Sequence, residues 1–497
     1  MTDALLSARE IVWGIPTLAM ILGVGLLISI CTGFAQVMLF PAAIRSFFRK
    51  PSERAGGEGT SPFRALCTAL AATVGTGNIV GVAGAICLGG PGSIFWMWIC
   101  GLLGMGIKFA EVTLALRFRT ASGVGGPMYM IANGMNYRWR WLAGVYCLFG
   151  VTASFGVGNA TQINAVLSGI NHVFQLFGRG ESLRRDLGIG LILAVLLGSV
   201  LLGGARRIGA AAELLVPAVS AVYVMLCVGV LVLRFSGIAE AFSAIIQGAF
   251  SPEAVTGGVT GSLFRTIQIG CSRGVFTNEA GMGTASIAHA SADAAHPVEQ
   301  GLYGILEVFL DTIVMCTLTA LAILVSGVPV SYGVDSGGSL TAAVFSDVLG
   351  EWASIILAVC MCCFAFATVL GWGLYGARCA QFLWGRGAWM PFALAQTVAV
   401  VLGSTLKTEN VWLFSEVLNG LMAIPNLIVL AAMLPELIRL TKEYKNRIGS
   451  NAAKGGNYAD FYQCKPLRTF SHAKIPPLCH GGRKGRQEDL SSEHRSA

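Results

Sequence analysis

The sequence predicts an all-α protein that crosses a membrane about eleven times. Of its 497 residues, 54% are hydrophobic and only 12% are charged, and the mean hydropathy is +0.68. A soluble chain would carry about 25% charged residues. Apolar runs of spanning length recur along the sequence, which is typical of a polytopic membrane protein. Glycines and polar residues interrupt two of these runs, and those interruptions organise the rest of the interpretation.

Each expected span is a run of apolar residues between polar or glycine-rich segments. The run at 141–176 is long enough to tilt or to extend beyond the bilayer. Residues 237–250 are expected to form a short helix at the membrane surface. The predicted spans are 12–40, 64–89, 93–116, 141–176, 187–204, 212–234, 260–288, 299–326, 351–383, 389–406 and 411–438.

Lysine and arginine predict the orientation, because they concentrate in cytoplasmic loops. With the N-terminus outside and the C-terminus in the cytoplasm, 25 of them lie inside and seven outside. The net charge of +8 therefore reflects orientation in a membrane and gives no indication of nucleic-acid binding. Most of the 14 cysteines lie in apolar runs as small hydrophobic residues, so no metal or redox cofactor is expected.

The first interrupted run contains T-V-G-T-G-N, from Thr73 to Asn78. Glycine tolerates non-helical dihedrals, so Gly75 and Gly77 favour local unwinding. Unwound backbone is tolerated in a membrane only beside a cavity or a polar partner. Its N–H groups can bind a carboxylate, and its oxygens suit a hard cation such as Na⁺. The candidate cation ligands are the carbonyls of Ala71, Thr73 and Val74 and the side chain of Asn78.

These features of the first run also have structural explanations. The glycines can simply allow close helix packing, as small residues do in membranes. Asn78 can join two helices through a hydrogen bond instead of binding a ligand.

The second interrupted run, I-G-C-S-R-G-V-F-T-N-E-A-G-M-G, extends over 269–283. Two interrupted spans at matching positions indicate a transporter binding site near the bilayer midplane. Five spans precede the second break and five begin with it. Because five is odd, the second set enters the membrane in the opposite direction, as in an inverted repeat.

This organisation divides the chain into five segments. The expected segments are an extra helix and basic loop at 1–63, a first repeat at 64–234, a connecting segment at 235–259, a second repeat at 260–438 and a disordered basic tail at 439–497.

Charged residues within the predicted spans need partners there, because an unpaired charge at the midplane costs at least ~2.5 kcal/mol. Lys108 and Glu111 are three residues apart, so they are expected to pair on one helix face. Arg273 and Glu279 flank the second break and are expected to pair as a gate or as a structural ion pair.

Other polar residues complete the candidate site. Asp311 is isolated in an apolar run and needs a cation, a proton or a basic partner, or it joins two helices. Gln162 can bind either end of an amino acid. Trp372 is a candidate wall of a small pocket, with simple packing as its alternative. The Thr368 hydroxyl is a candidate cation ligand.

Several function classes find no support in the sequence. It has no G-x-x-x-x-G-K-[ST] motif for ATP and no repeated filter segment for a channel. None of the six histidines is expected deep in a helix core, which argues against a membrane enzyme. A non-transporting amino-acid sensor remains an alternative, because it would keep the whole site.

Long motifs make the chain resemble the alanine or glycine:cation symporters, also called sodium:alanine symporters. The motifs run along most of 64–380 and comprise T-V-G-T-G-N-I-V-G-V-A-G-A-I (73–86), G-G-P-G-S-I-F-W-M-W (89–98), G-M-G-I-K-F-A-E-V-T-L-A (104–115), R-G-V-F-T-N-E-A-G-M-G-T-A (273–285), H-P-V-E-Q-G (296–301), F-L-D-T-I (309–313) and L-G-W (370–372).

The resemblance implies a leucine-transporter-type fold with an extra first helix, and Na⁺-driven or H⁺-driven uptake of alanine or glycine across a bacterial inner membrane. It implies a second cation at the carbonyls of Ala71 and Val74 with Thr368. This chain has Ala367 where the family often has a second hydroxyl. By motif match, the residues around the amino acid are Thr76, Gly77, Asn78, Gln162, Phe276, Asn278 and Trp372.

Overall fold

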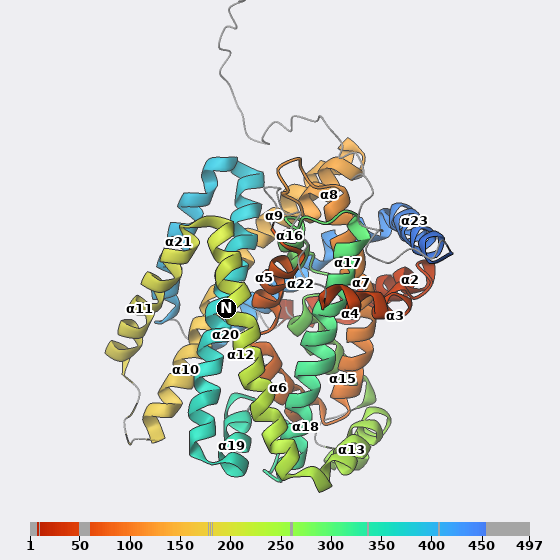
Figure 1. Cartoon of the computed structure of the whole chain (residues 1–497). Coiled ribbons are helices and arrows are strands. Elements are labelled where there is room, and N and C mark those ends of the chain that lie inside the picture. Colours follow the sequence, from red (N-terminus) through yellow and green to blue (C-terminus); the bar gives the residue numbers. More distant parts are fainter. Residues whose placement is uncertain are drawn as a thin grey trace, which may run out of the picture.

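The computed structural model describes residues 7–453 except 9, 49–59, 177, 179, 181, 259–261, 335–336 and 406–407. Within this part the chain is helical, and a single β-bridge between Thr60 and Ala292 is the only strand-like pairing. Figure 1 shows long helices that run side by side between two ends of the molecule. The predicted all-α class is confirmed.

Six helices in the described part are long and apolar enough to cross a membrane, and there are eight if two sharply bent pairs each count as one span. Every predicted span coincides with helix, although several of these helices are shorter than a full span. The number of eleven crossings therefore stays a prediction.

The N-terminal segment forms three helices where one span at 12–40 was predicted. The first ends early because Gly33 and Phe34 have positive φ of 64° and 49°. The Thr32 hydroxyl donates to the carbonyl of Ile28 at this turn. The three helices are α2 (Ile15–Cys31), α3 (Ala35–Met38) and α4 (Phe40–Phe47).

The first half of the core begins with the interrupted helix. Its elements are α5 (Pro62–Thr73), the π-helical turn η1 (Gly77–Gly81), α6 (Val82–Gly89), α7 (Ser93–Arg117), α8 (Pro127–Gly134), η2 (Tyr137–Trp139), α9 (Arg140–Phe155), the π-helical turn η3 (Gly156–Ala160), α10 (Thr161–Leu176), α11 (Leu183–Leu201) and α12 (Gly204–Leu233).

The helix predicted at 237–250 is present as α13 and leads to the second half. Its place at the membrane surface stays a prediction. The elements are η4 (Phe235–Gly237), α13 (Ile238–Phe250), α14 (Pro252–Thr256), α15 (Leu263–Asn278), α16 (Thr284–His289), α17 (Pro297–Val308), the π-helical turn η5 (Phe309–Cys316), α18 (Thr317–Ser326), α19 (Gly337–Leu349), α20 (Glu351–Trp384), η6 (Arg386–Ala388), α21 (Trp389–Gly403), α22 (Thr408–Ala432) and α23 (Leu434–Ala453).

Corresponding elements of the two halves pack against each other. The second segments, α7 and α17, are in contact, and so are the third segments, α9 and α10 with α20. The fourth segments, α11 and α21, also form a pair. These contacts between like positions agree with a two-fold relation between five-helix units, as in an inverted repeat.

The predicted loops lie at the expected ends. Figure 1 places α8, from a predicted cytoplasmic loop, at one end and α13 and α19, from predicted outer loops, at the other. The disordered tail was predicted from residue 439, which is wrong for 439–453, because these residues belong to α23. An amphipathic sequence and the buried Leu437 and Leu440 explain this helix. Residues 454–497 lie outside the described part.

Candidate functional site

Both predicted helix breaks are present. The first bends the chain by 53° between Pro62–Thr73 and Gly77–Gly89. Val74 is extended at the end of α5, and the N–H of Gly75 donates to the Asn78 side-chain oxygen over 2.9 Å. That bond replaces the helical bond from Gly75 to Ala71. The second break lies at 279–283, where Glu279, Gly281 and Gly283 have positive φ.

The glycines act differently in the two breaks. Neither Gly75 nor Gly77 has positive φ, so the unwinding at the first break does not depend on left-handed glycine. Their small size is used instead: a Cβ at Gly75 would lie 2.9 Å from the Thr368 hydroxyl, and one at Gly77 would lie 3.4 Å from Thr277. The first break is thus in close contact with both α20 and α15.

Thr368 presents an unpaired hydroxyl to the first break. Its Oγ1 is buried and has no hydrogen-bond partner among the described residues. A buried hydroxyl without a partner is costly, so this atom fits a role as a ligand to a bound cation. The carbonyls of Ala71 and Val74 belong to the adjacent turn, where α5 ends. Thr73 is also buried there, and its hydroxyl turns back to the carbonyl of Ala69 at 3.4 Å.

Four of the candidate amino-acid ligands lie close together at the first break. Thr76 donates to the Gln162 side-chain oxygen over 3.2 Å, which joins η1 to α10. Gln162 itself donates to the carbonyl of Val157 in η3. Gly77 faces the Phe276 ring, 3.7 Å from the position of a Cβ. Three segments distant in sequence, η1, η3 with α10, and α15, therefore supply one small region.

Trp372 is fixed by the second break. Its indole N–H donates to Glu279 Oε1 over 2.9 Å, and Glu279 Oε2 accepts from Thr284 over 2.6 Å. The indole packs on Gly158, where a Cβ would lie 2.2 Å from Trp372 Cβ. Glu279 therefore has partners other than Arg273.

The predicted pair of Arg273 and Glu279 is wrong. Arg273 instead approaches Glu416 of α22, with 3.5 Å between Nη1 and Oε1. The left-handed turn at Glu279 explains the difference, because it carries the carboxylate toward Trp372 and away from α15.

Asp311 joins helices. Its Oδ1 accepts from Asn78 over 2.7 Å, and its Oδ2 accepts from Thr312 over 2.9 Å. Thr312 in turn accepts from Asn278 over 3.0 Å. The Asn78 oxygen is already occupied by Gly75, so in this state Asn78 acts as the helix-joining residue of the structural alternative. A chain of side chains thus connects the two breaks through η5.

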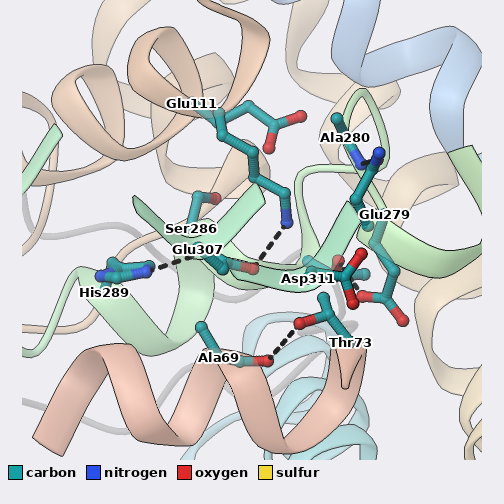
Figure 2. A network of polar contacts seen from close by, with 12 residues as sticks. Ala69, Thr73, Glu111, Glu279, Ala280, Ser286, His289, Glu307 and Asp311 are labelled. Atoms are coloured by element: carbon teal, nitrogen blue, oxygen red, sulfur yellow. Dashed lines mark hydrogen bonds and ion pairs between the residues drawn. The ribbon is translucent and has the colours of Figure 1, made fainter. Parts of the chain in front are cut away.

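A buried ion pair lies beside this chain. Figure 2 shows Glu307 beside His289 within a group of polar side chains. The distance from Lys108 Nζ to Glu307 Oε1 is 3.0 Å, and His289 Nε2 lies 3.1 Å from Glu307 Oε2. All three side chains are fully buried. The predicted pair of Lys108 and Glu111 is wrong, because the lysine turns toward α17 and Glu111 turns toward the second break.

His289 is the functional candidate that sequence reasoning missed. It was expected outside any helix core, yet it is fully buried at the end of α16. Gln300 lies 2.7 Å from its other ring nitrogen, Nδ1. The signal was present in the small, apolar neighbours of A-S-I-A-H-A, which predict burial of whatever residue they contain.

Comparison with known proteins agrees with this geometry. The family model for the sodium:alanine symporter family matches residues 1–456. The chain belongs to the sodium:alanine symporter family. This is a family of membrane transporters and not of enzymes, and its members couple amino-acid symport to a cation.

Two relatives illustrate the range of the family. The chain is 38% identical over 456 residues to the sodium/alanine symporter AgcS of Methanococcus maripaludis, covering 90% of this chain and 98% of that one. It is 33% identical to the probable sodium/glutamine symporter GlnT of Bacillus subtilis, covering 92% of each.

A solved structure confirms the fold of this family member. MhsT in complex with L-phenylalanine matches with a TM-score of 0.54 at 14% identity, over 78% of this chain and 99% of that chain. The shared fold is the predicted leucine-transporter type.

Proposed function

We propose that this protein is a Na⁺-driven symporter of small neutral amino acids, with alanine and glycine as substrates. The amino acid would bind between the two breaks, beside Thr76, Gly77 and Gln162. The positive end of the helix that begins at Gly77 suits the substrate carboxylate. Phe276 and Trp372 would limit the size of the side chain.

The observation that carries this proposal is the unpaired Thr368 hydroxyl at the first break. We assign the driving Na⁺ to this hydroxyl and to the carbonyls of Ala71 and Val74, because oxygen ligands suit a hard cation. Asn78 and Asp311 lie next to this region and hold the break in shape. Amino acid and cation would share one turn of backbone, so each favours binding of the other.

Two other readings make different predictions. A sensor would bind alanine without moving it. A larger substrate is suggested by the name of GlnT, although this chain places Trp372 directly on Gly158, and that close packing favours small side chains.

The test is uptake of labelled alanine into proteoliposomes, driven first by an inward Na⁺ gradient and then by a pH gradient alone. We expect accumulation that needs Na⁺ and that excess unlabelled glycine inhibits more strongly than glutamine. Asn78→Ala should abolish it, because Gly75 N–H and Asp311 lose their partner. Asn133→Ala is the matched control, since Asn133 is exposed at the end of α8.

Each contrary result has a distinct meaning. Accumulation driven by the pH gradient alone would overturn the Na⁺ assignment and direct attention to Asp311. Alanine binding without accumulation under either gradient would favour the sensor.

We also propose the orientation and the limits of the units. In a bacterial inner membrane, the N-terminus would lie on the outer side and α23 on the cytoplasmic side. The repeats would extend over 64–234 and 260–438. Labelling of single cysteines introduced at Ser122 and Ser339 from either side tests this orientation. It predicts that position 122 is reached only from the cytoplasm and 339 only from outside.

A further inference from the structure

Glu111 has two carboxylate oxygens in opposite environments. Oε1 accepts three hydrogen bonds: from Gly281 N–H at 2.9 Å, from Gly283 N–H at 3.0 Å and from Asn426 Nδ2 at 2.7 Å. Oε2 has no partner among the described residues. The side chain is fully buried in α7, so water does not reach the bare oxygen from the surface.

Asn426, which is bonded to Glu111, also has one oxygen without a hydrogen-bond donor. Its Nδ2 group donates to Glu111 Oε1 and to the carbonyl of Gly281. Its Oδ1 is buried without a donor among the described residues. Two bonded side chains therefore leave one acceptor oxygen each without a partner, and each such oxygen costs about 1–3 kcal/mol.

A single proton on Glu111 would give both oxygens a hydrogen-bond partner. In an ionised carboxylate the charge is shared by two equivalent oxygens, so a bare buried oxygen is unfavourable. In a carboxylic acid the oxygens differ: one is a carbonyl that accepts, and the other is a hydroxyl that donates. The well-bonded Oε1 fits the carbonyl and the bare Oε2 fits the hydroxyl. Asn426, whose amide nitrogen is bonded to Oε1, carries an acceptor oxygen without a partner.

A metal cation fits this place less well. Two backbone N–H groups and an amide NH₂ point at the carboxyl, and their positive ends repel a cation. A hard cation would also need several oxygen ligands, whereas the proton needs only one acceptor.

Several titratable groups lie around Glu111 and the ion pair beside it. Lys108 is on the same helix but is bonded to Glu307 of α17, which is also bonded to His289 of α16. Tyr146 of α9 and Tyr375 of α20 also lie within electrostatic range of Glu111. Glu279 of the second break and Asp311 of η5 lie within range of Lys108. The one ammonium of this group is thus engaged elsewhere.

We propose that Glu111 is a proton-binding site of the second break and that its proton moves with the amino acid. One H⁺ and the carboxylate form the acid, whose O–H donates to Asn426; no other bond changes. Movement of 279–283 away from α7 would open the carboxyl to water on the other side, where hydration stabilises the carboxylate and the proton passes to water. The transport half of this inference rests on the proposed symport, whereas the protonation itself does not.

Protonation is tested by infrared spectroscopy of the purified full chain. The spectrum at neutral pH should contain a carboxylic-acid C=O band that Glu111→Gln removes. Gln retains both an acceptor and a donor, so this variant should also keep the thermal stability of the parent. Glu213→Gln, in a partly exposed pair with Arg64, is the control that leaves the band intact.

A second variant keeps the test decisive if Glu111→Gln does not fold. Asn426→Leu removes the acceptor of the O–H, so the C=O band should shift to higher frequency. A parent spectrum identical to that of Glu111→Gln in this region, or a band unmoved by Asn426→Leu, would overturn the proton site.

Coupling is tested in proteoliposomes with Na⁺ on both sides and a pH-sensitive dye inside. Addition of alanine should acidify the interior for the parent. Glu111→Gln should reduce this signal at least tenfold and retain alanine exchange. Alanine uptake without acidification would overturn proton coupling and leave the Na⁺ symport intact. If Na⁺ drives no alanine uptake, the proposed function fails, and the infrared result alone decides whether Glu111 holds a proton.

Discussion

The buried pair of Lys108 and Glu307 offers the clearest test of the energetics of the core. Lys108→Met keeps most of the volume of the side chain and removes its charge. Of the two ion-pair partners that Glu307 has among the described residues, only His289 would then remain. The change in the free energy of unfolding of this variant measures how much of the stability of the fold depends on this single ammonium group.

The magnitude follows from the geometry. Two unit charges 3.0 Å apart attract by roughly 5–6 kcal/mol at an effective dielectric constant of ~20. The His289 N–H at 3.1 Å offsets part of the loss. We therefore expect Lys108→Met to lower the free energy of unfolding by about 3–5 kcal/mol, the range for a buried pair that loses one partner.

The assay is a double-variant cycle on thermal stability in detergent. Glu307→Gln removes the other charge and still accepts from His289. The double variant Lys108→Met/Glu307→Gln leaves no buried charge in this pair, so it should be more stable than either single variant. A Lys108→Met protein as stable as the parent, or additive effects in the double variant, would refute the ion-pair reasoning.

Two further predictions use matched controls. Gly158→Ala places a Cβ 2.2 Å from Trp372 Cβ and should cost about 1–3 kcal/mol in thermal unfolding, whereas Gly144→Ala, with nothing within 4 Å, should be neutral; equal effects would contradict the close contact. Burial, with Arg447 and Arg439 nearby, lowers the pKa of His296 to about 4 from 6.5. The folded state binds fewer protons than the unfolded state between these values, so stability is full above pH ~6.5 and falls by up to roughly 3 kcal/mol toward pH ~4. His296→Asn keeps an acceptor for Val298 N–H and should flatten this pH dependence in melting experiments; an unchanged slope would exclude His296 as its cause.

The sequence was sufficient for the order of the helices and for the two breaks. Spans of apolar residues and interrupting glycines are local signals, and both survive in the structure. The turn at Gly33 and Phe34 was missed because an apolar run conceals it. Helix α23 was missed because its charged face resembles the composition of a disordered tail.

The partners of the buried charges could not be predicted. Spacing along one helix suggested Lys108 with Glu111, and proximity in sequence suggested Arg273 with Glu279. Lys108 and Arg273 instead pair with Glu307 and Glu416, which belong to other helices more than a hundred residues away. Such pairing depends on how helices are rotated against each other, and a single sequence does not contain this information in a readable form. Whether the predicted ligands bind alanine and Na⁺ stays a prediction.

Helix α20 has a mechanical consequence for coupling. Thr368, proposed for the cation, and Trp372, proposed for the amino acid, are four residues apart on an uninterrupted helix of 34 residues. One turn separates them by about 6 Å along the axis. A stiff rod tilts as one body, so a tilt that withdraws the hydroxyl from Gly75 also swings the indole across Gly158. Movement of this one helix would therefore bind or release the cation and the amino acid together.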